Sequence, residues 1–270
     1  MHQKKASFEG NEVVYWTGGT GTPLLLLHGS GPGASTMGNW RLILEPLSQH
    51  FTVLATDLVG FGASGRKEAP PYFDLDLWQR QAKFLLDLWG HSTVDVLGHS
   101  LSGALALKLA ASDTRVRRVV ATGPLGVRYA LNKALERVWT FPASEDELRR
   151  TADLLVYDKS LIDDAYIQGR KKVLFADPEY GAYFSEMFSG DKQRFIDAAV
   201  LSSQEYAALD KPVLIVQGRN DQPTPPSAAM ELAERLPSAD LVLLDKCGHS
   251  VALEHPTKLV GLIKTFLATT

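Results

Sequence analysis

The chain has 270 residues, of which 45% are hydrophobic and 22% are charged, and its formal net charge is −3. This composition predicts a globular protein with a full hydrophobic core, and the charge excludes the basic surface typical of a nucleic-acid-binding protein. No apolar stretch approaches the roughly 20 residues that span a bilayer, the N-terminus lacks the apolar run of a signal peptide, and the lone Cys247 favours a cytoplasmic protein without membrane contact.

Short apolar runs and longer amphipathic stretches alternate through the first half of the chain. We expect strands at 12–16, 24–27, 51–55, 93–97 and 117–122, and helices at 40–47, 75–89 and 104–111. Such alternation is typical of a parallel sheet with helices on both faces. The sequence therefore predicts an α/β fold built on a mostly parallel sheet of eight strands.

The amino-acid composition changes between residues 126 and 209, where charged residues and tyrosine dominate and we expect no strand. Ser144 opens a predicted helix that runs to Tyr157, and Ser160 with Asp163 resembles a second capping box. We interpret residues 126–209 as a helical lid inserted into a core formed by residues 1–125 and 210–270. The core resumes with strands at 212–216 and 241–244 and helices at 227–236 and 256–267.

A candidate nucleophile, Ser100, lies where a predicted strand turns directly into a predicted helix. Around it, Gly98-His99-Ser100-Leu101-Ser102-Gly103 is a variant of the G-x-S-x-G string in which Ser102 replaces the final glycine. Small residues permit the tight turn that lifts the serine hydroxyl out of the sheet. A loop that merely contains glycine and serine is the alternative, and the residues that follow the later strands disfavour it.

A serine hydroxyl needs a base, and the base needs an acid to fix its orientation. Asp221 follows the predicted strand at 212–216, and His249 follows the one at 241–244. The order Ser, Asp, His places all three residues at the carboxyl ends of parallel strands, where open α/β sheets collect their sites. Ser100, Asp221 and His249 are therefore the predicted catalytic residues.

Other titratable residues compete for these roles with weaker placement. His255 precedes a proline and is expected to flank the last helix, and Asp245 is expected to face solvent. Asp57 ends an earlier strand and is interpreted as a turn residue that bonds its own loop. The remaining candidates, expected at the surface, are His2, His50 and His91.

The glycine-rich stretch His28-Gly29-Ser30-Gly31-Pro32-Gly33-Ala34 follows a predicted strand and can turn backbone amides toward a reacting carbonyl. We expect the N–H groups of Ser30 and Leu101 to form an oxyanion hole, and His28 to brace the loop. The same stretch also matches a dinucleotide-binding fingerprint with Asp57 as the ribose ligand. Pro32 and the delayed helix disfavour that alternative, an NAD-dependent oxidoreductase.

The whole chain resembles the α/β-hydrolases, and several segments resemble the meta-cleavage-product hydrolases, which cut a C–C bond in 2-hydroxy-6-oxohexa-2,4-dienoates. These segments are 28–34 with Asn39-Trp40, 156–162, 167–170 and 246–249. The resemblance implies that Arg170 holds the carboxylate or enolate end of the substrate and that Asn39 helps to orient it. A guanidinium suits this role because it grips a carboxylate with two parallel hydrogen bonds. A solvated lid residue is the alternative for Arg170.

Two positions depart from that family: His99 replaces the usual asparagine before the nucleophile, and Ser250 replaces the usual tryptophan after the histidine. They favour a carboxylesterase or lactonase as the second hypothesis, and a non-catalytic receptor for a small ligand is a third. The candidate substrate-binding residues are Gly29, Gly31, Asn39, His99, Arg170 and Ser250. No His, Cys or carboxylate cluster has metal-ligand spacing, so we expect no metal and no other cofactor. Self-association into a homo-oligomer stays open.

Overall fold

The computed structural model describes residues 1–268 of the chain. Its strands are β1 (His2–Phe8), β2 (Asn11–Gly18), β3 (Thr22–Leu27), β4 (Phe51–Thr56), β5 (Val94–His99), β6 (Val116–Thr122), β7 (Val213–Gly218) and β8 (Ala239–Leu244). Its helices are α1 (Thr36–Trp40), α2 (Leu44–Ser48), α3 (Leu75–Trp89), α4 (Leu101–Ser112), α5 (Lys133–Val138), α6 (Glu145–Leu155), the 3₁₀ turn η1 (Lys159–Leu161), α7 (Asp164–Leu174), α8 (Tyr180–Met187), α9 (Gln193–Ala199), α10 (Ser203–Ala208), α11 (Pro226–Arg235), α12 (Val251–Glu254) and α13 (Pro256–Ala268).

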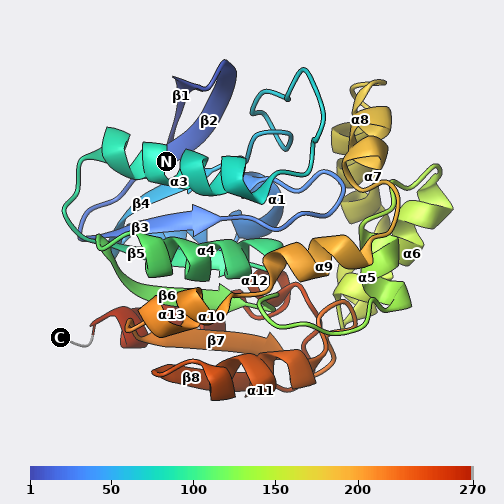
Figure 1. Ribbon diagram of the computed structural model, residues 1–270. Helices are drawn as coiled ribbons and strands as arrows, with labels where there is room; N and C mark the ends of the chain where they lie inside the picture. Colours follow the sequence, from blue (N-terminus) through green and yellow to red (C-terminus); the bar gives the residue numbers. More distant parts are fainter. Residues whose placement is uncertain (269–270) are drawn as a thin grey trace.

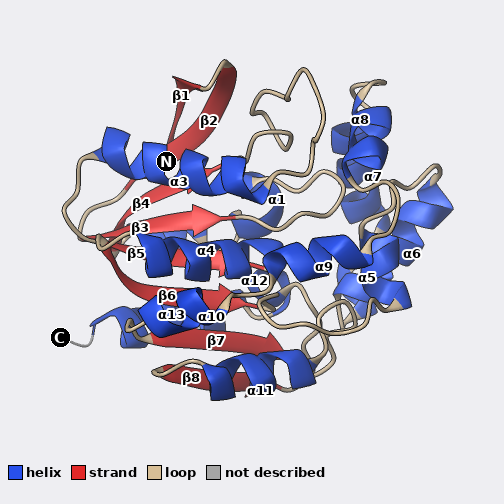
Figure 2. Ribbon diagram, viewed as in Figure 1, coloured by secondary structure: helices blue, strands red, loops and turns tan. Residues whose placement is uncertain are grey.

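The eight strands form one sheet in the order β1-β2-β4-β3-β5-β6-β7-β8. The β1–β2 and β2–β4 pairs are antiparallel, and the other five pairs are parallel. Figure 2 shows α3 and α4 in front of this sheet. The predicted α/β fold with a mostly parallel eight-stranded sheet is confirmed.

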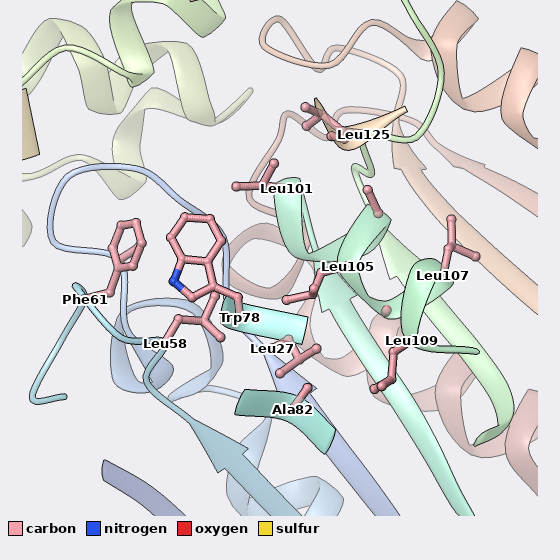
Figure 3. Close-up of a cluster of buried hydrophobic side chains, with 14 of the residues drawn as sticks. Leu27, Leu58, Phe61, Trp78, Ala82, Leu101, Leu105, Leu107, Leu109 and Leu125 are labelled. Atoms are coloured by element: carbon pink, nitrogen blue, oxygen red, sulfur yellow. The ribbon is translucent and has the colours of Figure 1, made fainter. Parts of the chain in front are cut away.

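Both faces of the sheet are covered, as the side chains of β3 show. Leu25 and Leu27 pack into the cluster that contains α3 and α4, whereas Leu24 and Leu26 pack into the cluster that contains α2 and α13. Successive residues of a strand point to opposite faces, so a run of four leucines is what a doubly covered strand requires. In Figure 3, side chains of α3 and α4 pack together over Leu27. This packing fixes the position of α4 and of the turn before it.

The helix α3 forms where its sequence places both ends and an apolar stripe. The side chain of Asp74 accepts a hydrogen bond from the N–H of Leu77, and Gly90 ends the helix with φ 75°. The buried residues recur with helical spacing: Leu77, Trp78, Gln81, Ala82, Leu85 and Leu86. The predicted helix at 75–89 is thus confirmed at both ends.

The segment between β6 and β7, called the insertion below, contains helices α5 to α10 and no strand among its residues 123–212, as expected. Figure 1 shows α5 to α8 beyond the arrowheads of the parallel strands, over the carboxyl edge of the sheet. That edge also carries the loops after β5, β7 and β8. The insertion therefore covers the side of the sheet that holds the candidate catalytic residues.

Three local expectations were wrong or incomplete. The helix expected at 40–47 is split into α1 and α2, because Pro46 has no N–H for the carbonyl four residues earlier. Ser160 does not cap α7; it lies in η1 and bonds Asp158, and Asp163 is the N-cap. Strand β1 was not predicted, because it is an edge strand whose side chains are mostly exposed.

Candidate active site

Ser100 occupies the sharp turn between β5 and α4. Its backbone angles, φ 57° and ψ −121°, are ones that a residue with a side chain rarely adopts. Neighbouring glycines make the turn possible: a Cβ on Gly98 would lie 2.1 Å from the carbonyl oxygen of Ser102, and one on Gly103 would lie 2.6 Å from Cβ of Pro124. The fold thus holds Ser100 in the strained strand-to-helix turn that the sequence indicated.

Asp221 and His249 leave the carboxyl ends of the neighbouring strands β7 and β8. His249 Nδ1 lies 2.8 Å from Asp221 Oδ2, and the two side chains are 4% and 0% exposed. Because a carboxylate only accepts hydrogen bonds, Nδ1 carries the proton and Nε2 keeps its lone pair. Ser100 and His249 line one cavity, and the Ser100 hydroxyl has no hydrogen-bond partner among residues 1–268. This arrangement can remove a proton from a serine hydroxyl or from water.

The loop after β3 carries the expected oxyanion donor Ser30. Neither the N–H of Ser30 nor that of Leu101 has an acceptor within the described part of the chain, so both stay available to a ligand. His28 braces the loop, as expected: its Nε2 accepts from the N–H of Leu58 at 3.0 Å, and its Nδ1 donates to the carbonyl of Gly29 at 2.6 Å. Burial lowers the pKa of His28, which keeps this bracing ring neutral.

The insertion holds the same loop at three points. Trp139 Nε1 donates to the hydroxyl of Ser30 at 2.9 Å, and the N–H of Gly33 donates to the hydroxyl of Tyr180 at 2.9 Å. Arg170 on α7 donates to the carbonyls of Gly33 and Pro32. The oxyanion loop is therefore positioned by the insertion as well as by β3.

The candidate substrate-binding residues come together with Ser100 and His249 around a cavity of about 100 Å³. Its lining includes Gly29, Gly31, Asn39, His99, Arg170 and Ser250. The opposite wall was missed from the sequence and consists of Val138, Pro142, Leu148, Thr151, Ala152, Leu155 and Tyr166 from the insertion. Four of these, at 148, 151, 152 and 155, have the spacing of one face of α6, and this spacing is the signal that could have found them.

Trp139 and Phe141 of the insertion do not line this cavity. Trp139 stacks on Phe188 at an interplanar angle of 11°, and Phe141 packs against Phe184. These aromatic side chains pack the insertion on itself and on the core.

His99 is a neutral acceptor in the cavity wall. Its Nδ1 lies 3.0 Å from the carbonyl of Thr122, so Nδ1 carries the proton and Nε2 does not. Burial, and then the nearby His249, hold the pKa of His99 well below its ordinary value of 6.5. The two imidazole rings lie 4.6 Å apart between centroids. The side-chain amide of an asparagine at this position could both donate and accept hydrogen bonds. His99 offers the cavity only the lone pair of Nε2, so it can only accept.

The competing residues lie where the sequence placed them. Asp245 is exposed, and His255 is half-buried with Nε2 3.0 Å from the carbonyl of Lys246. His2, His50 and His91 are exposed as well.

Asp57 is fully engaged inside the protein. Its carboxylate accepts from the N–H of Ala63 in its own loop and from the N–H of Thr36, the first residue of α1. It is 1% exposed, so no face of it is open to a ribose. This removes the main support for the dinucleotide-binding alternative.

Comparison with known proteins identifies the fold family. A family model described as "Alpha/beta hydrolase family" matches residues 24–262, which is most of the chain. The chain belongs to the alpha/beta hydrolase family. The predicted hydrolase fold is therefore confirmed.

Two curated relatives of this hydrolase are each 34% identical over 251 residues, or 93% of the chain. They are the 2-hydroxymuconate semialdehyde hydrolase of Pseudomonas sp. and the 2-hydroxy-6-oxo-2,4-heptadienoate hydrolase of Pseudomonas putida, which are covered over 88% and 90% of their lengths. The predicted resemblance to the meta-cleavage-product hydrolases is confirmed.

Solved structures agree with these relatives. The meta-cleavage product hydrolase of Pseudomonas fluorescens superposes with a TM-score of 0.93 at 33% identity, covering 98% of this chain and 97% of that one. The 2-hydroxy-6-oxo-6-phenylhexa-2,4-dienoate hydrolase of Rhodococcus sp. gives 0.89 at 27% identity, covering 99% of both chains.

No helix within residues 1–268 is long and apolar enough to cross a membrane. The same residues contain no group of three or more His, Cys, Asp or Glu side chains placed to hold a metal ion.

Proposed function

We propose that this hydrolase cleaves the C5–C6 bond of 2-hydroxy-6-oxohexa-2,4-dienoates, using Ser100, His249 and Asp221. One observation carries the proposal: a single cavity contains Ser100 and His249 together with Arg170 and Asn39. Nucleophile and base can thus act on one end of a ligand while a guanidinium holds a carboxylate at the other. The relatives that act on 2-hydroxymuconate semialdehyde and on 2-hydroxy-6-oxo-2,4-heptadienoate support this substrate class.

In this mechanism the dienol first ketonises, so that the proton of the 2-hydroxyl is lost and C5 gains one. Arg170 stabilises the negative charge near C1 and C2 during this step. Ser100, or a water in its place, then attacks the C6 carbonyl and gives its proton to His249. The N–H groups of Ser30 and Leu101 bind the resulting oxyanion.

Collapse of the tetrahedral intermediate breaks the C5–C6 bond, and the electron pair moves to the dienolate. Proton return from His249 completes 2-hydroxypenta-2,4-dienoate. If Ser100 attacked, water hydrolyses the acyl group by the same steps, and a carboxylic acid leaves. Asp221 stabilises the imidazolium each time it forms. The proposed reaction uses no metal and no organic cofactor.

We extend the proposal to the insertion and to the whole molecule. Residues 126–209 act as the lid over a core of residues 1–125 and 210–270, since the insertion supplies one wall of the cavity and three contacts to the oxyanion loop. The partner is a small-molecule substrate. A cytoplasmic location fits the single, unpaired Cys247, and self-association into a homo-oligomer is compatible with the same function.

The test is a stopped-flow record of dienoate bleaching, with p-nitrophenyl acetate as a parallel ester substrate. We expect Arg170→Ala to slow bleaching of the 6-methyl dienoate about 100-fold, because only the dienoate offers a carboxylate to the guanidinium. Ester hydrolysis should fall less, by the share that the two hydrogen bonds of Arg170 to the oxyanion loop contribute. Lys172→Ala, an exposed site on the same helix, is the matched control. Ester turnover without bleaching would favour the carboxylesterase or lactonase alternative, for which the presence of His99 and Ser250 argues. Binding with no turnover of either substrate would favour a receptor.

A further inference from the structure

The carboxylate of Asp221 is buried, and no lysine or arginine among residues 1–268 forms an ion pair with it. Its side chain is 0% exposed, and His249 is the ion-pair partner that it has within residues 1–268. A buried carboxylate is strongly unfavourable unless hydrogen bonds satisfy its oxygens. The groups that donate to Asp221 therefore decide its orientation toward His249.

Thr224, three residues later in the same turn, donates to both carboxylate oxygens. Its N–H lies 2.8 Å from Oδ1 of Asp221, and its hydroxyl lies 2.8 Å from Oδ2. The hydroxyl also lies 3.1 Å from the carbonyl of Gly123 and 3.2 Å from Nδ1 of His249. Since a threonine hydroxyl has one proton and the carboxylate is the charged acceptor, this proton belongs to Oδ2. The Thr224 hydroxyl thus lies beside the contact between Asp221 and His249 and within reach of both.

Gln217, the fifth residue of β7, supplies another hydrogen-bond donor to the Asp221 carboxylate. Its Nε2 lies 3.0 Å from Oδ2 of Asp221 and 2.9 Å from the carbonyl of Thr224, and the residue is completely buried. Its Oε1 has no partner among the described residues. A flipped amide would place Oε1 against the carboxylate, acceptor against acceptor. The carboxylate therefore dictates the amide orientation, and the unpaired oxygen is its consequence.

We propose that Thr224 and Gln217 are positioning residues that hold the Asp221 carboxylate aimed at Nδ1 of His249. This inference rests on the proposed function, because it assumes that His249 is the base. Neither residue touches the cavity that holds Ser100, so each acts through Asp221. Gly123 closes the pair from the β6 side, since a Cβ there would lie 3.0 Å from Asp221 Oδ2 and 3.1 Å from His249 Nδ1.

The loss of one hydrogen-bond donor to Asp221 is expected to shift the pH dependence of kcat/KM in one direction. With fewer hydrogen bonds, the carboxylate keeps more of its negative charge for the imidazolium of His249, so protonation of the base is favoured. The ascending limb of kcat/KM against pH then moves to higher pH. The titratable groups that face the pair are His99, Tyr129 and Cys247, and Glu254 accepts from the nearby N–H of Gly248.

Three of those groups stay neutral around pH 7. Burial raises the pKa of Tyr129 and of Cys247, and burial together with His249 lowers the pKa of His99. These three neighbours therefore add no charge change of their own to the profile around pH 7.

The experiment measures kcat, KM and the pH profile of p-nitrophenyl acetate hydrolysis for Thr224→Val, Thr224→Ser and Gln217→Met. Gln222→Ala, an exposed side chain in the same turn, is the control. We expect Thr224→Val to lower kcat about 10-fold at unchanged KM, the size of one charge-assisted hydrogen bond, and to move the ascending limb to higher pH. Thr224→Ser should restore both. Gln217→Met should act in the same direction.

Either of two results would overturn the inference. In the first, both kcat and the limb are unchanged in Thr224→Val and Gln217→Met. In the second, kcat falls without a move of the limb and Thr224→Ser gives no rescue, which would indicate packing alone. Failure of the proposed function is separate, because it would appear as full ester activity in Ser100→Ala or as no dienoate bleaching by the unmodified enzyme.

Discussion

Gly123→Ala is expected to damage catalysis more than its effect on stability can explain. Gly123 has φ +50°, and an added Cβ would lie 3.0 Å from Oδ2 of Asp221 and 3.1 Å from Nδ1 of His249. The backbone conformation alone costs about 1–2 kcal/mol for a residue with a Cβ. The contacts force the Asp221–His249 pair to move by a few tenths of an ångström. Since about 1 Å of misplacement can cost 100-fold, we expect kcat to fall about 10-fold.

Gly90→Ala is the matched control. Gly90 ends α3 with φ +75°, and an added Cβ there would meet no atom within 4 Å. Both variants should lose similar stability in urea unfolding, about 1–2 kcal/mol, and only Gly123→Ala should lose kcat with p-nitrophenyl acetate. Equal kcat in the two variants would refute the reasoning, because it would show that the contact with the Asp221–His249 pair has no bearing on turnover.

Two further predictions concern the oxyanion loop and His99. Tyr180→Phe removes the acceptor of the Gly33 N–H and should cost about 1 kcal/mol of stability in urea unfolding. It should also lower kcat for esters. An unchanged kcat would mean that the hydrogen bond between Gly33 and Tyr180 does not position the loop. Because the pKa of His99 is held well below 6.5, the unfolded chain takes up the proton first, so stability is lost as pH falls below 6.5, by at most about 1.4 kcal/mol per pH unit. Urea midpoints between pH 5 and 7 should fall less steeply in His99→Asn, and identical slopes would contradict this prediction.

The elements that carry the candidate site were readable because their signals are local. Buried strands such as β3 are continuous apolar runs, and the turn at Ser100 needs glycines at fixed offsets that the sequence displays. Asp221 and His249 follow from topology, since parallel strands deliver their loops to one edge of the sheet. These inferences needed no knowledge of packing.

What the sequence did not reveal depends on contacts between distant segments. The cavity wall formed by α6 is a helix face whose pattern fits any buried surface, and its partner is decided by how the insertion folds over the sheet. The polar side chains of Gln217 and Thr224 gave no signal, because their role exists only once the turn brings them onto Asp221. Arg170 could equally have been solvated until the structure placed it against Gly33 and the cavity.

The most direct test of the central claim is the rate at which Ser100→Ala bleaches the 6-methyl dienoate, with the products identified by mass spectrometry. Circular dichroism should show an intact fold in this variant. The account predicts that the unmodified enzyme releases 2-hydroxypenta-2,4-dienoate and acetate, and that Ser100→Ala slows this on the order of 10⁴-fold. Bleaching at the unmodified rate in Ser100→Ala, with the same two products, would contradict the claim that Ser100 takes part in the cleavage.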